Sequence, residues 1–203
     1  CFLLFGITGS GKTEVYLNLI WAALQAGKQA LVLVPEISLT PTLESLFRQR
    51  FPGAILCVQH SNMPESERAR SWLDACDGHA DIVLGTRLGV FVPLPRLGLI
   101  VVDEEQDPSF KQQEGLRYSA RDLAIYRGRM SAVPVLLCSA TPSLESMHHA
   151  LNGRYRLLRL NVRAHRDARL PRVRVIDTNV TNVREGISQP LHEAIQKRLD
   201  QKE

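Results

Sequence analysis

Long apolar runs are missing from this sequence of 203 residues. No stretch approaches the roughly 20 apolar residues that a membrane-spanning helix needs, which excludes a helical membrane protein. The start, Cys1–Phe5, has neither a methionine nor the basic segment of a signal peptide, and it is typical of a strand taken from within a longer chain. We therefore expect a cytoplasmic protein without membrane contacts.

Cysteine is also scarce, with four residues, and none of them lies two positions from another. This spacing excludes a zinc knuckle and a paired redox motif. Cys57 and Cys138 stand inside apolar runs and are predicted to be buried thiols. A buried, unpaired set of cysteines favours a reducing compartment.

Net charge is small as well, at +4, but it is unevenly distributed. The segment from Arg154 to Arg174 contains eight arginines and one acid, Asp167. A local excess of positive charge suits three roles: it follows nucleic-acid phosphates, faces a neighbouring domain, or forms a solvated linker. The sequence leaves all three open.

Short apolar segments alternate with helical patterns along most of the chain. The predicted strands are nearly uniformly apolar and bounded by turn residues, which is typical of strands buried on both faces of a parallel sheet. They are Cys1–Phe5, Gln29–Val34, Ala54–Gln59, Asp81–Leu84, Leu99–Val102 and Val133–Cys138. The predicted helices are Lys12–Gln25, Thr42–Arg50, Glu65–Cys76, Ala120–Arg129 and Ser143–Leu151. This order predicts an α/β fold, a doubly wound and mostly parallel sheet with helices on both faces.

The pattern changes after the last of these helices. Arg154–Leu160 alternates basic and apolar residues as an edge strand does, and Val173–Asp177 predicts another short strand. Gln189–Gln201 predicts a polar helix. We therefore place one domain at residues 1–165 and an exit linker toward a second domain at residues 166–203.

A glycine-rich segment follows the first predicted strand and opens the first predicted helix. Its sequence, GITGSGKT at residues 6–13, fits the phosphate-binding pattern GxxxxGK[ST] in the context that the pattern requires, although an ordinary turn with a surface lysine is the alternative. Glycines let backbone N–H groups turn around a phosphate, and the helix N-terminus adds positive charge. Lys12 is expected to reach the β- and γ-phosphates of ATP, and the Thr13 hydroxyl to bind Mg²⁺. The predicted nucleotide-binding residues are Gly6, Thr8, Gly9, Ser10, Gly11, Lys12 and Thr13.

Three acids and a glutamine, residues 103–106, follow the predicted strand Leu99–Val102. In doubly wound sheets, ligands bind beyond the C-terminal ends of the strands. Asp103 is therefore placed to hold Mg²⁺, directly or through water, and Glu104 to polarise the attacking water. Three acids after a buried strand are costly unless a cation faces them, although a solvated acidic turn is the alternative.

Three more strand ends carry residues that suit a nucleic acid. N–H groups, hydroxyls and an arginine at one rim of the sheet suit phosphates, although each segment alone is equally compatible with a simple turn. The segment Ser139–Thr141, which follows the predicted strand Val133–Cys138, also matches the superfamily 2 helicase motif that couples nucleotide state to DNA. The candidate residues are Pro35 and Glu36, Thr86 and Arg87, and Ser139 and Thr141.

Together these segments resemble the PriA family of bacterial replication-restart helicases, also called primosomal protein N′. The matching segments are residues 6–16, 34–41, 85–87, 103–106, 110–124 and 139–142. The resemblance implies the first RecA-like, P-loop motor domain of an ATP- and Mg²⁺-dependent 3′→5′ DNA helicase that remodels stalled or forked DNA. It also implies single-stranded and forked DNA, single-stranded DNA-binding protein and other primosome proteins as partners. Location at the bacterial nucleoid, and zinc only in a part of the family outside this chain, are implied as well.

Residues 110–124 match the family's aromatic-rich loop, which couples DNA binding to ATP hydrolysis. Phe110 and Tyr118 are expected to stack on exposed bases, at roughly 1–3 kcal/mol per base. The alternative is that either ring packs the loop onto the domain. Phosphate contacts are expected from the cations of the loop, which are Lys111, Arg117 and Arg121.

The sequence departs from the family at Gln106, where the family has histidine. Glutamine donates and accepts hydrogen bonds but never becomes cationic, so coupling between ATP and DNA is expected to differ in detail. We group Gln106 with Glu104 and Lys12 as the catalytic set.

Segments that complete such a motor are not found in this sequence, among them the second domain's arginine finger. We therefore expect a fragment with weak activity by itself. One rival is a P-loop ATPase that does not act on DNA, which has no need of stacking aromatics beside its acidic segment. The other is a nucleic-acid-binding module without hydrolysis, and intact Lys12, Thr13, Asp103 and Glu104 argue against it.

Overall fold

The computed structural model describes residues 1–61, 63–164 and 173–201. The chain has two compact units, Cys1–Arg166 and Asp167–Glu203. The predicted domain boundary after residue 165 lies outside the described residues. No helix in the described ranges is long and apolar enough to cross a membrane.

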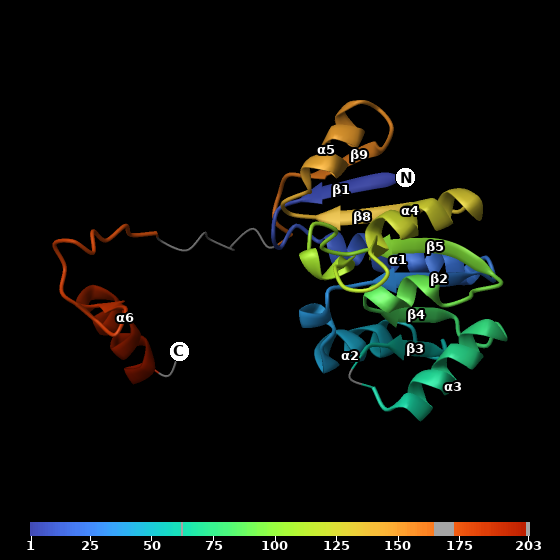
Figure 1. Cartoon of the computed structure of the whole chain (residues 1–203), viewed down its shortest axis with the longest axis horizontal. Helices are drawn as coiled ribbons and strands as arrows, with labels where there is room; N and C mark the ends of the chain where they lie inside the picture. Colours follow the sequence, from blue (N-terminus) through green and yellow to red (C-terminus); the bar gives the residue numbers. More distant parts are fainter. Residues whose placement is uncertain (62, 165–172, 202–203) are drawn as a thin grey trace. The chain divides into compact units, whose positions relative to one another are not determined.

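Strands and helices alternate through the first unit (Figure 1). The strands of its large sheet are β1 (Phe2–Gly6), β2 (Gln29–Leu33), β3 (Leu56–Gln59), β4 (Ile82–Gly85), β5 (Leu97–Val102), β8 (Val135–Ser139) and β9 (Arg156–Leu160). The α-helices are α1 (Lys12–Gln25), α2 (Pro41–Arg50), α3 (Glu65–Cys76), α4 (Ala120–Met130) and α5 (Leu144–Leu151). Three 3₁₀ turns are η1 (Glu36–Ser38), η2 (Arg87–Phe91) and η3 (Pro108–Phe110). A small hairpin is formed by β6 (Lys111–Gln112) and β7 (Tyr118–Ser119).

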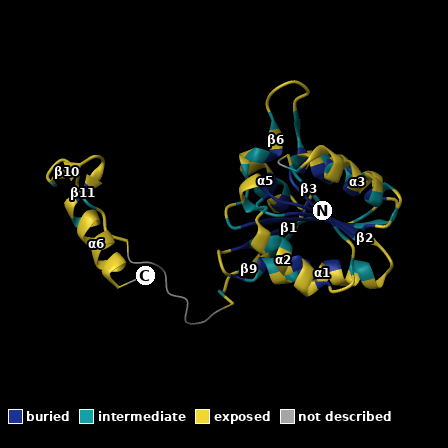
Figure 2. Cartoon of the chain, turned by 90° about the horizontal axis from the view of Figure 1, so that it is seen from below, coloured by how far each residue is buried: buried dark blue, intermediate teal, exposed yellow. Residues whose placement is uncertain are grey.

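The seven strands of the large sheet described here pair in parallel, in the order β3-β4-β2-β5-β8-β1-β9. Parallel pairs need crossover connections, which α-helices supply for most of these strands. Tyr16 of α1 and Phe47 of α2 pack on one face, whereas Ala75 of α3, Ala124 of α4 and Ala150 of α5 pack on the other. Figure 2 shows the sheet buried between these two layers. The predicted doubly wound α/β fold is confirmed.

The predicted elements of this unit agree with the observed bounds to within two residues, and α1 and α3 match at both ends. Strand β9 is the predicted edge strand and pairs with β1. The predicted strand at Val173–Asp177 is wrong, because these residues have no regular structure. Val173 and Val175 are 86% and 91% exposed, so their β-branched side chains gain no packing that would favour a strand.

Capping serines begin helices α4 and α5. Ser119 Oγ accepts a hydrogen bond from Asp122 N at 3.2 Å at the start of α4. Ser143 Oγ accepts one from Ser146 N at 3.3 Å at the start of α5. Such caps satisfy N–H groups that the helix itself leaves free, so they fix where each helix starts.

The second unit contains the antiparallel hairpin of β10 (Val183–Arg184) and β11 (Ile187–Ser188), followed by α6 (Gln189–Asp200). Glu185 and Gly186 form the turn, with φ angles of 51° and 82°. Positive φ at both turn positions matches the twist of a two-residue hairpin. Helix α6 lies within the predicted polar helix.

Close packing of α4 on β8 makes a first testable prediction. A Cβ added to Gly128 would overlap Cγ2 of Val135. Gly128→Ala is therefore expected to lower the free energy of unfolding by about 1–3 kcal/mol, despite the better helix propensity of alanine. Urea denaturation measures this. In Gly128→Ala/Val135→Ala the loss should be smaller than the sum of the two single losses, and additive losses would contradict the overlap.

Candidate functional site

The C-terminal ends of five adjacent strands form one rim of the large sheet. Because these strands are parallel neighbours in the order β4, β2, β5, β8 and β1, the segments that follow them meet at the same edge. In that order the segments are Thr86–Arg87, Pro35–Glu36, residues 103–106, Ser139–Thr141 and residues 6–13. The predicted common rim is confirmed.

The glycine-rich loop between β1 and α1 has the backbone that a phosphate cradle requires. Gly9 and Gly11 have φ angles of 76° and 89°, a region that strains residues with a Cβ. Lys12 is buried and its Nζ donates to the Gly6 carbonyl at 2.8 Å. The ammonium is thus held against the loop that it is predicted to serve.

The same loop has a hydrogen-bonding hydroxyl without a partner. Ser10 Oγ is buried and has no hydrogen-bond partner among the described residues. Thr8 and Gly9 are exposed on the outer side of the loop. An orphan hydroxyl, the ammonium of Lys12 and the N-terminus of α1 together fit an anionic phosphate.

Tyr16 lies beside the two predicted Mg²⁺ ligands, Asp103 and Thr13, and the sequence analysis did not single it out. Its side chain is 1% exposed, and its hydroxyl lies close enough to Asp103 and Thr13 for both to affect its pKa. Burial, followed by the charge of Asp103, raises the pKa of Tyr16 well above its usual value, so it stays a donor. Its position three residues after Thr13, on the same helical face, was an available signal.

Asp103 at the end of β5 fits a divalent cation. Burial and the neighbouring Glu104 raise the pKa of its carboxyl above the ordinary value, which means that the charged form is disfavoured there. A carboxylate beside a threonine hydroxyl is a ligand set that Mg²⁺ accepts, and a bound cation would favour the ionised form. Asp103 and Thr13 are the residues that would hold it.

A chain of hydrogen bonds runs from Glu104 to the end of β8. Gln106 Nε2 donates to Glu104 Oε2 at 2.9 Å, and Ser139 Oγ donates to Gln106 Oε1 at 2.6 Å. Thr141 N in turn donates to Ser139 Oγ at 2.9 Å. Gln106 therefore uses both its donor and its acceptor, as the sequence analysis expected of glutamine at this position.

The predicted DNA loop forms the β6–β7 hairpin, which projects from the first unit with an exposed tip (Figure 2). Lys111 and Arg117 are exposed on it. Tyr118 is half-buried, with its ring edge-on to Phe91 at a centroid distance of 5.1 Å. The cations of the hairpin are accessible to a phosphate backbone, whereas the Tyr118 ring is partly covered.

Two predicted contact residues of this loop are corrected. Phe110 is 1% exposed and belongs to the core, so its ring does not present a face to a base. Burial of a phenylalanine contributes about 1.5–3 kcal/mol, which competes well with base stacking. Arg121 has a side chain only 9% exposed and is ion-paired with Glu105, so it does not present its guanidinium to a phosphate.

The other predicted nucleic-acid residues divide by exposure. Glu36 and Thr141 are exposed, whereas Pro35, Thr86 and Ser139 are buried. Of these residues, Glu36 and Thr141 are therefore the ones whose side chains are open to a ligand at this rim.

Arg87 links the rim to the loop. It is half-buried, and its Nη1 donates to the Ser109 carbonyl at 3.2 Å. Its Nε is buried without a hydrogen-bond partner within the described part of the chain. The structure therefore joins the Thr86–Arg87 segment to the start of the predicted DNA loop.

Comparison with known proteins identifies the class of this domain. Residues 2–150 match the DEAD/DEAH box helicase family, and the chain belongs to that family. The chain is similar to replication restart protein PriA of Haemophilus influenzae, at 46% identity over 199 residues, which are 98% of this chain and 27% of that protein. PriA of Bacillus subtilis is 44% identical over 87% of this chain and 22% of its own length. The resemblance to PriA is thus confirmed, and the chain spans about a quarter of these relatives.

The fold also resembles that of a solved structure. The structure of RecG bound to a three-way DNA junction matches with a TM-score of 0.59 over 83% of this chain and 21% of that one, at 24% identity. Likeness at this identity supports the RecA-like fold and no finer property.

The raised pKa of Asp103 makes a second testable prediction. Because the folded state binds the Asp103 proton more tightly than the unfolded state does, ionised Asp103 lowers stability at neutral pH, and this loss disappears as pH falls. Asp103→Asn is therefore expected to raise Tm at pH 7 in EDTA. It should also lower ATP turnover by on the order of 10²-fold or more, because a bound metal supplies several kcal/mol.

Exposed Asp77→Asn is the control and should change the free energy of unfolding by less than about 0.5 kcal/mol. A Tm for Asp103→Asn below that of the wild type would contradict the assignment of a desolvated, unfavourable charge.

Proposed function

We propose that this chain is the first motor domain of a DNA helicase, which couples Mg-ATP hydrolysis to movement along single-stranded DNA. One observation carries the proposal. The acidic segment at residues 103–106 faces the phosphate loop across β8, and it continues within a few residues into the exposed, basic β6–β7 hairpin. A nucleotide site and a polyanion-binding surface both adjoin the end of β5. Binding at one of them can therefore change the free energy of binding or reaction at the other.

The nucleotide chemistry follows from the residues at the ends of β1 and β5. Backbone N–H groups and Lys12 bind the phosphates, and Thr13 and Asp103 hold Mg²⁺, which neutralises phosphate charge when bound. Glu104 orients and polarises the attacking water. Gln106 holds the Glu104 carboxylate through the bond at 2.9 Å.

The DNA contacts belong mainly to the hairpin. Lys111 and Arg117 are exposed cations that neutralise phosphates without reading sequence. The Tyr118 ring is partly covered by Phe91. When the ring turns away from Phe91, it can stack on a base. The exposed Glu36 and Thr141 lie along the C-terminal rim of the large sheet, where they border the path of the DNA strand.

The biological role comes from the relatives. The name replication restart protein, carried by proteins 46% and 44% identical to this chain, supports action at stalled or forked DNA. Movement in the 3′→5′ direction, contact with single-stranded DNA-binding protein and other primosome proteins, and a cytoplasmic, nucleoid-associated location belong to the same proposal. This chain alone is expected to hydrolyse ATP weakly, because an arginine finger from another domain contributes on the order of 10³–10⁵ in rate.

ATP turnover by the full-length protein, with and without single-stranded DNA, tests this function. We expect strong stimulation by DNA in the wild type, and loss of turnover in Lys12→Ala with an unchanged circular dichroism spectrum. Turnover that is indifferent to DNA would leave an ATPase that acts on another substrate. Wild-type turnover by Lys12→Ala would remove the nucleotide assignment.

The hairpin predicts the salt dependence of binding. Lys111→Ala and Arg117→Ala should each weaken binding of single-stranded DNA and reduce the slope of log K against log salt by about 0.7, since each removes one phosphate contact. Lys28→Ala is the matched control, because Lys28 is exposed but precedes β2, at the opposite edge of the sheet. Fluorescence anisotropy over a salt series measures the slopes. An equal change in the control would show that the hairpin is not the contact surface.

A further inference from the structure

The residue proposed to polarise water, Glu104, has a strained backbone. Its φ angle is 48°, in the left-handed region that residues with a Cβ rarely adopt. Such a conformation costs of order 1–3 kcal/mol and persists where the surroundings hold it in place. Its own bonds are few: Glu104 N donates to Asp103 Oδ1 at 3.0 Å, its carbonyl accepts from Asp107 N at 2.9 Å, and its carboxylate accepts from Gln106 Nε2 at 2.9 Å.

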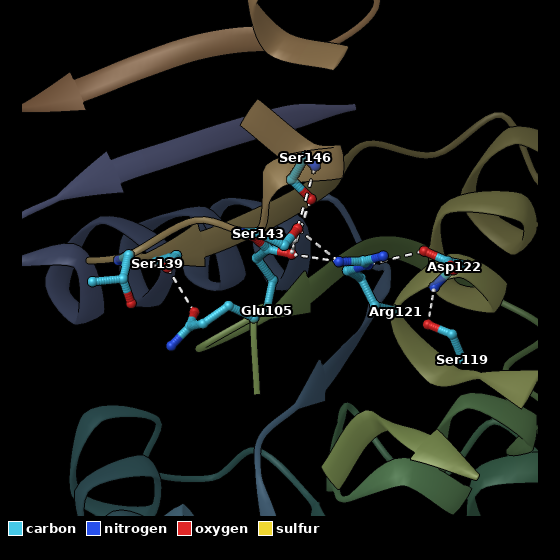
Figure 3. A network of polar contacts seen from close by, with 9 residues as sticks. Glu105, Ser119, Arg121, Asp122, Ser139, Ser143 and Ser146 are labelled. Carbon is cyan, nitrogen blue, oxygen red and sulfur yellow. Dashed lines mark hydrogen bonds and ion pairs between the residues drawn. The ribbon is translucent and has the colours of Figure 1, made fainter. Parts of the chain in front are cut away.

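The next residue, Glu105, is the most firmly held part of this turn. Its side chain is fully buried, and its backbone N donates to the Cys138 carbonyl at 3.0 Å. Its carboxylate accepts four hydrogen bonds from three other residues (Figure 3). The donors are Arg121 Nη1 at 3.1 Å, Ser143 N at 2.8 Å, Ser143 Oγ at 3.1 Å and Ser146 Oγ at 2.9 Å.

These donors belong to two different helices. Ser143 and Ser146 are the N-cap and the first turn of α5, where N–H groups and the helix dipole favour an anion. Arg121 lies in the first turn of α4. A buried carboxylate with its acceptors filled in this way cannot move without leaving charge unpaired, which is strongly unfavourable.

Arg121 connects this anchor to the hairpin. It follows β7 by two positions, and Ser119, the last residue of β7, caps the same helix. Its Nη1 bonds Glu105 and Ser143, and its Nε bonds Asp122 at 2.9 Å. Figure 3 shows its guanidinium between these partners. A shift of the hairpin at β7 therefore reaches the Glu105 carboxylate through one side chain, whose guanidinium these hydrogen bonds hold in place.

We propose that Glu105 is a positioning residue, which fixes the left-handed turn that carries Glu104 and joins that turn to the DNA hairpin through Arg121. The inference rests on the proposed function and deepens it, since it names the contact by which DNA at the hairpin regulates the water-polarising group. In this proposal, Glu105 and Arg121 do not touch nucleotide or DNA. Both act through Glu104.

The test measures kcat and KM for ATP at saturating single-stranded DNA, and the Kd for that DNA, in the full-length protein. Glu105→Gln places an amide NH₂ among hydrogen-bond donors, which releases the turn. We expect kcat to fall on the order of 10- to 100-fold, as for a misplaced catalytic group, with KM and Kd within about twofold of wild type. Glu145→Gln, an exposed acid in the first turn of α5, is the matched control and should retain wild-type kcat.

A double-mutant cycle separates positioning from a general structural role. In a Glu104→Gln background, Glu105→Gln should lower kcat by no more than about twofold further, because the group through which it acts is already gone. Multiplicative losses would overturn the proposal. Wild-type kcat in a folded Glu105→Gln would overturn it too.

Arg121→Lys tests the connection and also serves if Glu105→Gln does not fold. Lysine keeps the charge but not the fork that bonds Glu105, Ser143 and Asp122 together, so kcat at saturating DNA should fall at least about fivefold while Kd for DNA is unchanged. Unchanged kcat, or a weakened Kd that marks Arg121 as a phosphate contact, would overturn the proposal. A wild type without DNA stimulation would refute the proposed function instead, before any variant is measured.

Discussion

Parallel pairing of β5, β8 and β1 is the constraint on which the rest of the structure depends. Adjacent strands lie about 4.7–4.9 Å apart, so β1 and β5, which flank β8, lie about 10 Å apart, and the phosphate loop and Asp103 that follow them share one edge of the sheet. The register pairs Val102 with Leu137 and Phe5 with Ser139. A slip of one residue would turn Asp103 to the other face of the sheet and separate it from Thr13, the other residue proposed to hold Mg²⁺. The apolar uniformity of these strands therefore serves the site as much as the core.

Most of this arrangement was predictable because its determinants are local in sequence. Strands buried on both faces need uninterrupted apolar residues, and the left-handed backbone of the phosphate loop needs Gly9 and Gly11, so both leave a direct mark on the sequence. Helices α4 and α5 begin directly after the capping residues Ser119 and Ser143, which is a local signal of the same kind. Once the strands were known to be parallel, the shared rim followed without side-chain detail.

The remainder depends on contacts between distant residues. The partners of Glu105 lie 16, 38 and 41 positions away, and no periodicity in the sequence reveals such a set. Phe110 and Tyr118 belong to one loop and have similar rings, yet tertiary packing buries the former and leaves the latter half-buried. Val173 and Val175 led to the prediction of a strand that the structure lacks. β-branched residues favour a strand only where neighbours pack against them, and these two side chains are exposed.

The bond between Lys12 Nζ and the Gly6 carbonyl has a consequence for affinity. A lysine side chain has about 2 kcal/mol of rotamer entropy to lose when it becomes fixed. Here that loss has already occurred on folding, because the ammonium is buried and tethered by its own loop. An anion that enters the loop exchanges a neutral acceptor for a charged one and restricts little further motion. Preorganisation of this kind lets the loop discriminate by charge and shape at a small entropic penalty.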